Sequence, residues 1–197
     1  MEIGDGMADT LNVLSICGSL RKGSFNAIVE RALPALAPEQ MSITPAPPHR
    51  QFPIYNFDIQ HEQGIPADVA TLGKAILAAD GVVIVSAEYN FSIPGGLKNA
   101  IDWLSRMKEP SPFAGKPFAI ASATSGSVGG ARMQYHLRQV LNGLNAFVLN
   151  SPEIFIGNAK SKVDQAKREL TDETTRDFIR KQLAAFAVLI ERVRLRD

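Results

Sequence analysis

Short runs of apolar residues alternate with amphipathic helical patterns along most of this chain of 197 residues. The clearest run is Gly81–Ser86 (GVVIVS), which is uncharged, rich in β-branched residues and of the right length for a buried strand. Strands that alternate with helices form an open parallel sheet covered on both faces. Five such strands and about five helices predict an α/β doubly wound fold with a five-stranded parallel sheet of order 2-1-3-4-5.

The same patterns predict where the elements lie. We expect strands at 11–17, 41–44, 81–86, 116–122 and 146–149. We expect helices that open near Ser24 or Asn26 and near 65–68, and further helices over 96–107, 130–141 and 171–193. Pro34 should shorten or kink the first helix, and the proline-rich stretch 45–53 should be a loop. Thr171 should cap the last helix, with a buried stripe of Phe178, Leu183, Phe186 and Ile190.

Length and composition limit the class of protein. The length fits one domain, which we expect over 10–195, with a flexible N-terminal tail at 1–9. The chain has 21 basic and 20 acidic residues, so it lacks the charge that a nucleic-acid partner requires. Its single cysteine, Cys17, cannot form an internal disulfide. The sequence carries no signal peptide and no long apolar run, so we expect no membrane partner and a cytoplasmic location.

A ligand of this fold binds beyond the carboxyl ends of the first and third strands. The first strand runs into GSLRKGSFN at 18–26, a loop that leads into a helix N-terminus. Backbone N–H groups and the positive helix end suit an anion. Ser19, Ser24 and Asn26 can add neutral hydrogen bonds. Arg21 can bind a phosphate through two charge-assisted hydrogen bonds. The alternative is that this segment is a plain loop with a helix cap, but the position of the loop at the predicted ligand-binding edge favours phosphate binding.

The third strand runs into Glu88, Tyr89, Asn90, Phe91 and Ser92. Tyr89 or Phe91 can line one face of a planar ring, while Asn90 and backbone groups meet the polar edge of that ring. In the alternative, both aromatic rings fill the gap between the loop and a helix. A phosphate loop on the adjacent strand favours a phosphorylated planar ligand. The loop after the fourth strand, TSGSVGG at 124–130, is flexible enough to approach such a ligand closely.

Several other functions fail on specific residues. The chain has no Gly-Lys-Ser/Thr of a Walker A loop and no full glycine fingerprint of a dinucleotide fold. Ser125 stands where a nucleophile elbow around Ser127 needs glycine. The three histidines, His49, His61 and His136, lack metal-ligand spacing and are expected at the surface or in caps. We expect Cys17 to be a small buried hydrophobe, and Trp103 to pack in the core or at a dimer contact.

Three stretches together resemble the NADPH-dependent FMN reductase family of flavodoxin-like proteins, and most closely its bacterial chromate reductase and quinone reductase branch. They are the loop at 18–26, Glu88-Tyr89-Asn90 and PGGLKNAIDWL at 94–104. A fourth stretch at 129–139 is similar to the same branch, and the resemblance spans about 11–157. It implies a flavodoxin-like three-layer sandwich that binds FMN without a covalent bond.

The resemblance also implies a role for each loop. The FMN phosphate would contact Ser19, Arg21, Ser24 and Asn26, and the ring would contact the residues from Glu88 to Ser92. Thr124, Ser125 and Gly126 would close the far side. Members usually carry proline where this chain has Ala87. They form homodimers or homotetramers, which makes Arg132 and Tyr135 candidates for a subunit contact or for binding the nicotinamide nucleotide.

The implied reaction is NADPH- or NADH-dependent reduction of quinones, chromate or similar small acceptors. The flavin carries this chemistry, so we assign no catalytic side chain and no metal ligand. One shared site predicts ping-pong kinetics. For an anionic acceptor, Arg21 or Arg106 could supply attraction. A flavodoxin-type electron carrier is the main alternative, although the balanced charge lacks a carrier's acidic surface. A regulator that binds FMN without turnover stays open.

Overall fold

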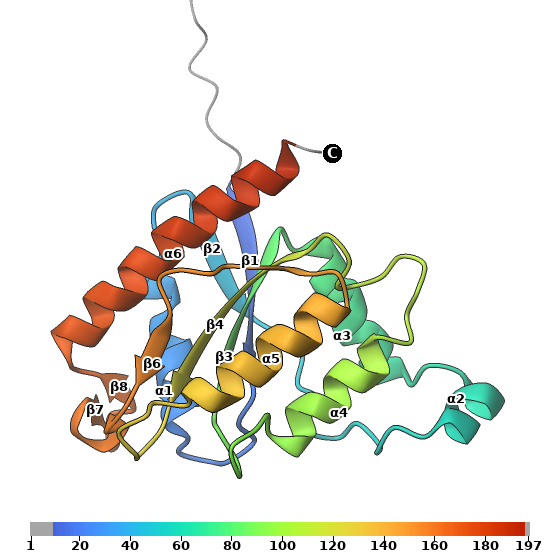
Figure 1. Cartoon of the computed structure of the whole chain (residues 1–197), viewed down its shortest axis with the longest axis horizontal. Helices are drawn as coiled ribbons and strands as arrows, with labels where there is room; N and C mark the ends of the chain where they lie inside the picture. Colours follow the sequence, from blue (N-terminus) through green and yellow to red (C-terminus); the bar gives the residue numbers. More distant parts are fainter. Residues whose placement is uncertain (1–9, 196–197) are drawn as a thin grey trace, which may run out of the picture.

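The computed structural model describes residues 10–195, so the tail predicted at 1–9 lies outside the described residues. A parallel sheet of order β2-β1-β3-β4-β5 forms the middle layer, as the sequence predicts (Figure 1). Its strands are β1 (Leu11–Cys17), β2 (Met41–Pro45), β3 (Gly81–Ser86), β4 (Pro117–Ala123) and β5 (Phe147–Val148). A further strand, β6 (Ile154–Ile156), pairs in parallel with the end of β4.

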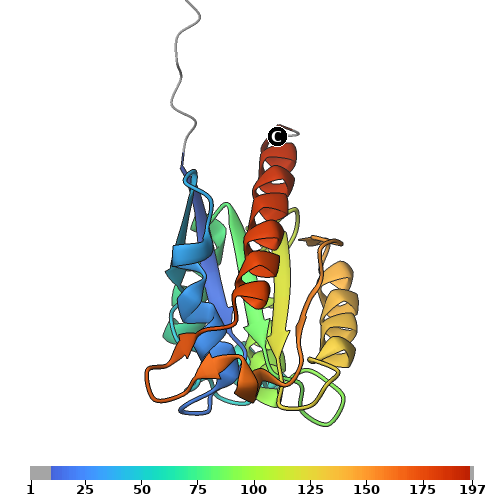
Figure 2. The same cartoon turned by 90° about the vertical axis from the view of Figure 1, so that its left-hand side faces the viewer.

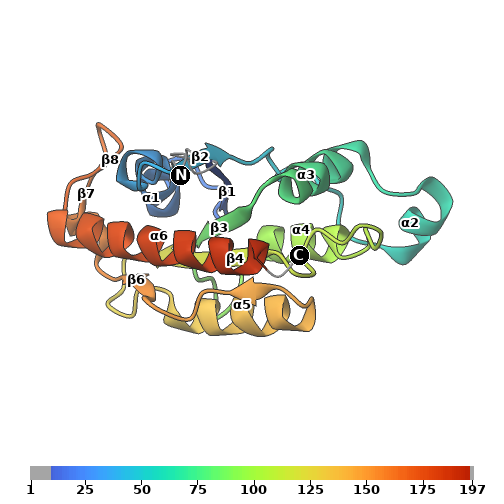
Figure 3. The ribbon, with the colours of Figure 1, turned by 90° about the horizontal axis from the view of Figure 1, so that it is seen from above.

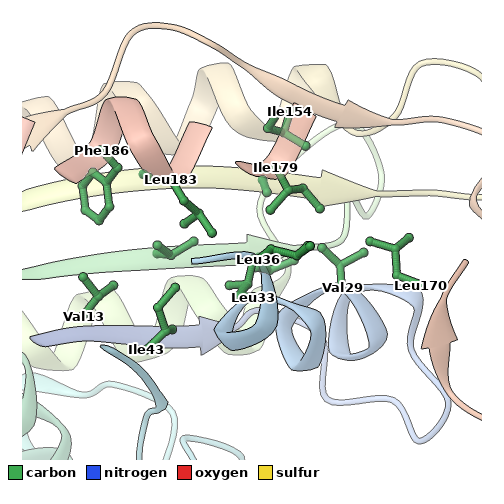
Figure 4. Close-up of a cluster of buried hydrophobic side chains, with 14 of the residues drawn as sticks. Val13, Val29, Leu33, Leu36, Ile43, Ile154, Leu170, Ile179, Leu183 and Phe186 are labelled. Atoms are coloured by element: carbon green, nitrogen blue, oxygen red, sulfur yellow. The ribbon is translucent and has the colours of Figure 1, made fainter. Parts of the chain in front are cut away.

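Helices cover both faces of the sheet. They are α1 (Phe25–Ala32), α3 (Ala67–Ala78), α4 (Gly95–Leu104), α5 (Ala131–Gly143) and α6 (Glu173–Arg194), while the short helix α2 (Phe57–Gln63) buries none of its residues. Side chains of α1 and α6 pack on one face in a cluster that includes Val29, Leu183 and Phe186 (Figure 4). Side chains of α3, α4 and α5 pack on the other face. The sheet is therefore buried on both sides, which is why its central strands read as continuous apolar runs.

The register of the sheet places three loops together. Cys17 lies opposite Val85, and Ser86 lies opposite Ser122, so β1, β3 and β4 end at nearly the same level. Parallel strands present their carboxyl ends at one edge, which is the lower edge in Figure 2. The loops that follow these strands are the ones that the sequence selects as ligand-binding.

Some local expectations are wrong. Four elements were not predicted: α2, β6, and the short pair formed by β7 (Val163–Asp164) and β8 (Glu169–Leu170). Asp172, rather than Thr171, caps α6: its Oδ1 accepts a hydrogen bond of 2.9 Å from the N–H of Thr175. Phe178 is exposed, because it lies outside the stripe that Leu183, Phe186 and Ile190 bury. The first helix ends at Ala32, ahead of Pro34, as expected.

No helix among residues 10–195 combines the length and the apolar character that crossing a membrane requires.

Candidate FMN site

The loops after β1, β3 and β4 line one cavity of about 150 Å³ at the carboxyl edge of the sheet. The lining contains predicted residues from all three loops: Ser19, Arg21, Ser24, Asn26, Glu88, Tyr89, Thr124 and Ser125. The other four predicted residues, Asn90, Phe91, Ser92 and Gly126, belong to the same loops but are outside this lining. The structure thus brings together loops that lie up to about a hundred positions apart in the sequence.

The loop at 18–26, here called the phosphate loop, is held at both of its ends. Ser24 caps α1, since its Oγ accepts a hydrogen bond of 3.1 Å from the N–H of Asn26. A Cβ on Gly18 would lie 2.2 Å from the Oγ of Ser86, so only glycine lets the ends of β1 and β3 approach this closely. In the described part of the chain, Arg21 has no acidic partner in an ion pair. This cavity therefore offers hydroxyls, a helix N-terminus and one unpaired guanidinium to an anion.

Asn26 links two of the loops. Its side-chain N–H donates to the carbonyl of Ala123 at 2.9 Å, and its Oδ1 accepts from the N–H of Ala123 at 2.8 Å. The side chain is almost fully buried. Asn26 thereby fixes α1 against the end of β4 and so holds the phosphate loop beside the loop at 124–130, here called the third loop. Its contact to a phosphate stays a prediction.

The residues Glu88–Ser92, here called the ring loop, form a tight hairpin. Tyr89 and Ser92 exchange two backbone hydrogen bonds, of 3.1 and 3.0 Å. Asn90 and Phe91 both have positive φ angles, 48° and 67°, as the central residues of a type I′ turn do. Phe91 and Tyr89 are 63% and 46% exposed, which contradicts the alternative in which both rings fill a gap inside the protein. The hairpin instead presents aromatic surface at the mouth of the cavity.

The carboxylate of Glu88 turns toward α5. It forms an ion pair of 2.7 Å with Arg132 and accepts a hydrogen bond of 3.1 Å from the N–H of Met133. Arg132 also lies over the ring of Phe91, with its Cζ 3.8 Å from the ring centre. Tyr135, the other candidate for a subunit contact, is half exposed and its hydroxyl lies 3.3 Å from Glu153. Within this chain, Arg132 therefore serves the ring loop.

The third loop is braced by β6, which the sequence did not reveal. The N–H of Thr124 donates to the carbonyl of Ile156 at 3.0 Å, and the N–H of Asn158 donates to that of Gly126 at 3.0 Å. A Cβ on Gly129 would lie 2.6 Å from the carbonyl carbon of Phe155, so the two segments cross in close contact. The signal in the sequence was the short apolar run Ile154–Ile156 followed by glycine.

For four other residues, the structure corrects or completes what the sequence led us to expect. Arg106 lies at the end of α4, over the ring of Tyr55, and is not part of the cavity lining. His49 is buried rather than at the surface, and its burial lowers its pKa. Trp103 is fully buried and donates to the carbonyl of Pro53 at 2.7 Å, which leaves it to the core. Cys17 is only partly buried, and this burial still raises the pKa of its thiol to about 11.

The site suits a ligand with two different ends. Hydroxyl groups, a helix N-terminus and Arg21 suit a phosphate, and the exposed aromatic hairpin beside them suits a planar ring. The model for NADPH-dependent FMN reductases matches residues 11–161, most of the chain. The chain belongs to this family. Membership confirms the prediction of an FMN-dependent enzyme that uses NAD(P)H, and the flavodoxin-like fold.

Three relatives show how far this family likeness extends. A quinone reductase of Escherichia coli (strain K12) is 50% identical over 189 residues, which are 96% of this chain and 100% of that protein. An NAD(P)H-dependent FMN reductase of Pseudomonas aeruginosa is 43% identical over 95% of this chain and 100% of its own length. The solved structure of FerB, a flavoenzyme NAD(P)H:(acceptor) oxidoreductase from Paracoccus denitrificans, has a TM-score of 0.81 and 31% identity, covering 93% of this chain and 98% of that one.

Proposed function

We propose that this FMN reductase passes electrons from NADPH or NADH to quinones. The observation that carries the proposal is the cavity at the carboxyl edge of the sheet, in which phosphate-binding groups adjoin an exposed aromatic hairpin. The 50% sequence identity with a quinone reductase, over nearly the whole chain, supports quinones as the acceptor class. Dependence on NAD(P)H supports the cytoplasm as its location.

We propose that each loop holds a different part of FMN. Ser19, Arg21, Ser24 and Asn26 take the phosphate end, and the ring loop, Glu88, Tyr89, Asn90, Phe91 and Ser92, takes the ring. Thr124, Ser125 and Gly126 close the remaining side. When bound, FMN supplies the hydride and electron chemistry. The protein therefore binds, orients and shields the flavin and needs no nucleophile of its own.

The two substrates are proposed to occupy one face in turn. A hydride carries two electrons and one proton, so a quinone takes one further proton from solvent to become a hydroquinone. A shared face requires oxidised NAD(P) to leave before the quinone enters, which is a ping-pong order. Initial rates at several fixed quinone concentrations should give parallel double-reciprocal lines against NADPH. Intersecting lines would show that both substrates bind together and would contradict the shared face.

Quinone-dependent oxidation of NADPH by the FMN-loaded protein tests the function itself. The proposal expects turnover with simple benzoquinones, and far slower turnover when oxygen replaces the quinone. FMN-loaded protein that oxidises NADPH at the same rate with and without quinone would overturn quinone as the acceptor. Chromate is proposed as a further acceptor, because a reduced flavin can pass electrons to other small oxidants. Chromate should therefore speed the oxidation of NADPH by the FMN-loaded protein, and no rate above that with oxygen alone would contradict this.

We also propose that the protein assembles as a homodimer or homotetramer through α2. This helix projects beyond α3 and α4 (Figure 1, Figure 3). Its segment is anchored, since Pro53 accepts hydrogen bonds from Asn99 at 2.9 Å and Trp103 at 2.7 Å, yet Ile54 and Phe57 are 85% and 63% exposed. Large apolar side chains on an anchored projection are typical of an interface.

Light scattering after size exclusion tests this assembly. The wild type should have two or four times the mass of one chain, and Ile54→Ser combined with Phe57→Ser should lower it. Val188→Ser, at an exposed apolar position of α6, is the matched control and should change nothing. A monomeric wild type would contradict the proposal.

A further inference from the structure

The ring loop holds a backbone conformation that its sequence does not favour. Its two central residues both have positive φ, and the second of them is Phe91, a bulky residue that seldom adopts this conformation. Glycine normally fills that position of a type I′ turn. Such a conformation persists only where surrounding structure holds it in place, and it gathers at functional sites. The restraint must come from outside the hairpin, because two residues between paired ends cannot supply it.

One face of α5 supplies this restraint at both ends of the hairpin. At the first end, Arg132 and the N–H of Met133 hold the carboxylate of Glu88. In the middle, Arg132 covers the ring of Phe91. At the second end, Nδ1 of His136 lies 2.9 Å from the hydroxyl of Ser92. Arg132 and His136 are one helical turn apart, so both point to the same side of α5.

We propose that His136 is a positioning residue for the flavin reaction, which keeps the ring loop in its strained turn by holding Ser92. His136 is itself exposed, so packing in the core does not account for its place. The contact also tolerates either tautomer of the imidazole, since a serine hydroxyl can donate to a bare nitrogen or accept from a protonated one. The inference rests on the proposed assignment of the ring loop to the flavin ring.

Two flavins separate the ring loop from the phosphate loop. Riboflavin carries the ring without the phosphate, so its affinity depends on the contacts of the ring and not on those of the phosphate. The full-length protein, freed of FMN, is titrated with FMN and with riboflavin while flavin fluorescence is followed. His136→Leu should weaken both flavins by a similar factor, about three- to tenfold, because one side-chain hydrogen bond is lost. Arg21→Ala should weaken FMN while leaving riboflavin unchanged.

Two further variants separate positioning from folding. His136→Asn places an amide near the position of Nδ1 and should restore most of the affinity for both flavins. Gln139→Ala, at an exposed position one turn further along α5, should bind as the wild type does. Leucine is a better helix former than histidine, so loss of α5 is not expected in His136→Leu. An unchanged thermal midpoint confirms that the fold is intact.

Amide hydrogen exchange supplies a readout that needs no flavin. The N–H groups of Tyr89 and Ser92 close the hairpin, so their exchange should be faster in His136→Leu than in the wild type. Wild-type riboflavin affinity together with wild-type exchange in His136→Leu would overturn the role of His136. A wild-type protein that takes up neither flavin would instead overturn the flavin assignment, and the exchange rates would still decide whether His136 holds the hairpin.

Discussion

The phosphate loop and the ring loop line the same cavity but are held in different ways. The phosphate loop is held at both ends by the elements that it joins: Gly18 approaches the end of β3 closely, Ser24 caps α1, and Asn26 binds the backbone of Ala123 at the end of β4. The ring loop depends on α5, whose Arg132 lies 44 positions from Glu88 and whose His136 lies 44 positions from Ser92. The first loop is therefore fixed where it joins the sheet and α1, and the second is a strained turn that the side chains of α5 maintain.

This difference assigns a separate task to each loop. A phosphate has the same shape in many ligands, so backbone N–H groups at a helix end suffice to bind it. A flavin ring must be placed so that one face stays open to substrates, which requires a loop of defined shape. Changes in the phosphate loop should therefore alter how tightly FMN is held, and changes at α5 should alter how the ring is held.

The largest effect is expected from Gly18→Ala. The new Cβ would lie 2.2 Å from the Oγ and 2.6 Å from the Cβ of Ser86, which is fully buried. Separating β1 from β3 should lower the free energy of unfolding by about 3 kcal/mol and release FMN. Urea unfolding and the flavin content of the purified protein measure both. Gly95→Ala is the control, because its Cβ would meet nothing within 4 Å in the described residues. Equal stability of Gly18→Ala and wild type would refute the close approach.

Arg21→Ala should have the next largest effect, on FMN alone. A charge-assisted contact to phosphate contributes about 1.5–3 kcal/mol, so the dissociation constant for FMN should rise by about ten- to 150-fold. Lys22→Ala removes the same charge from the neighbouring residue, which is not part of the cavity lining, and should have little effect. Fluorescence titration measures both variants. If Arg21→Ala and Lys22→Ala bind FMN equally well, Arg21 does not hold the phosphate.

Arg132→Met should act on the ring loop with a smaller effect. It removes the ion pair with Glu88, whose side chain is 8% exposed, while Arg132 itself is 44% exposed and partly screened by solvent. The binding free energies of FMN and of riboflavin should both become less favourable, by about 1 kcal/mol. Combined with His136→Leu, the loss should be less than the sum of the two, since both residues hold one hairpin. Strict additivity would show that they act independently.

The smallest effect is expected at Cys17, beside the phosphate loop. Burial raises the pKa of its thiol to about 11, so the neutral thiol persists across the physiological range and the reactive thiolate forms only in strong alkali. Alkylation of the folded protein by iodoacetamide should be slow at pH 8 and rise about tenfold per pH unit toward that pKa. Mass spectrometry follows the reaction, with urea-unfolded protein as the control. Equal rates in the folded and unfolded protein would contradict the burial.

The sequence predicted those features that depend on local patterns. The apolar strand runs and the loops at their carboxyl ends led to residues such as Ser19 and Arg21, and the family resemblance added Thr124; the structure places all three around one cavity. Arg106 was misplaced although the predicted topology holds the answer: α4 begins at the carboxyl edge of the sheet after β3 and runs back along it, so Arg106, which follows its end, lies away from the cavity. The helix α2, described in full, buries none of its residues and so leaves no apolar stripe to recognise.

The restraint on the ring loop could not be predicted for another reason. Nothing in the sequence around His136 or Arg132 indicates a contact with the hairpin, because their partners lie in the loop after β3, far away along the chain. The strained turn was also hidden, since Asn90-Phe91 lacks the glycine that marks a type I′ turn. Contacts between distant segments that oppose local preference are therefore the part of this site that only the fold reveals.

The visible absorbance spectrum of the protein, recorded without oxygen, tests the central claim most directly. Protein loaded with FMN should lose its oxidised-flavin absorbance within seconds of adding NADPH, and benzoquinone added afterwards should restore it. A colourless protein that takes up no added FMN, or a flavin spectrum that neither NADPH nor NADH changes, would contradict the account of this site as the centre of a quinone-reducing FMN enzyme.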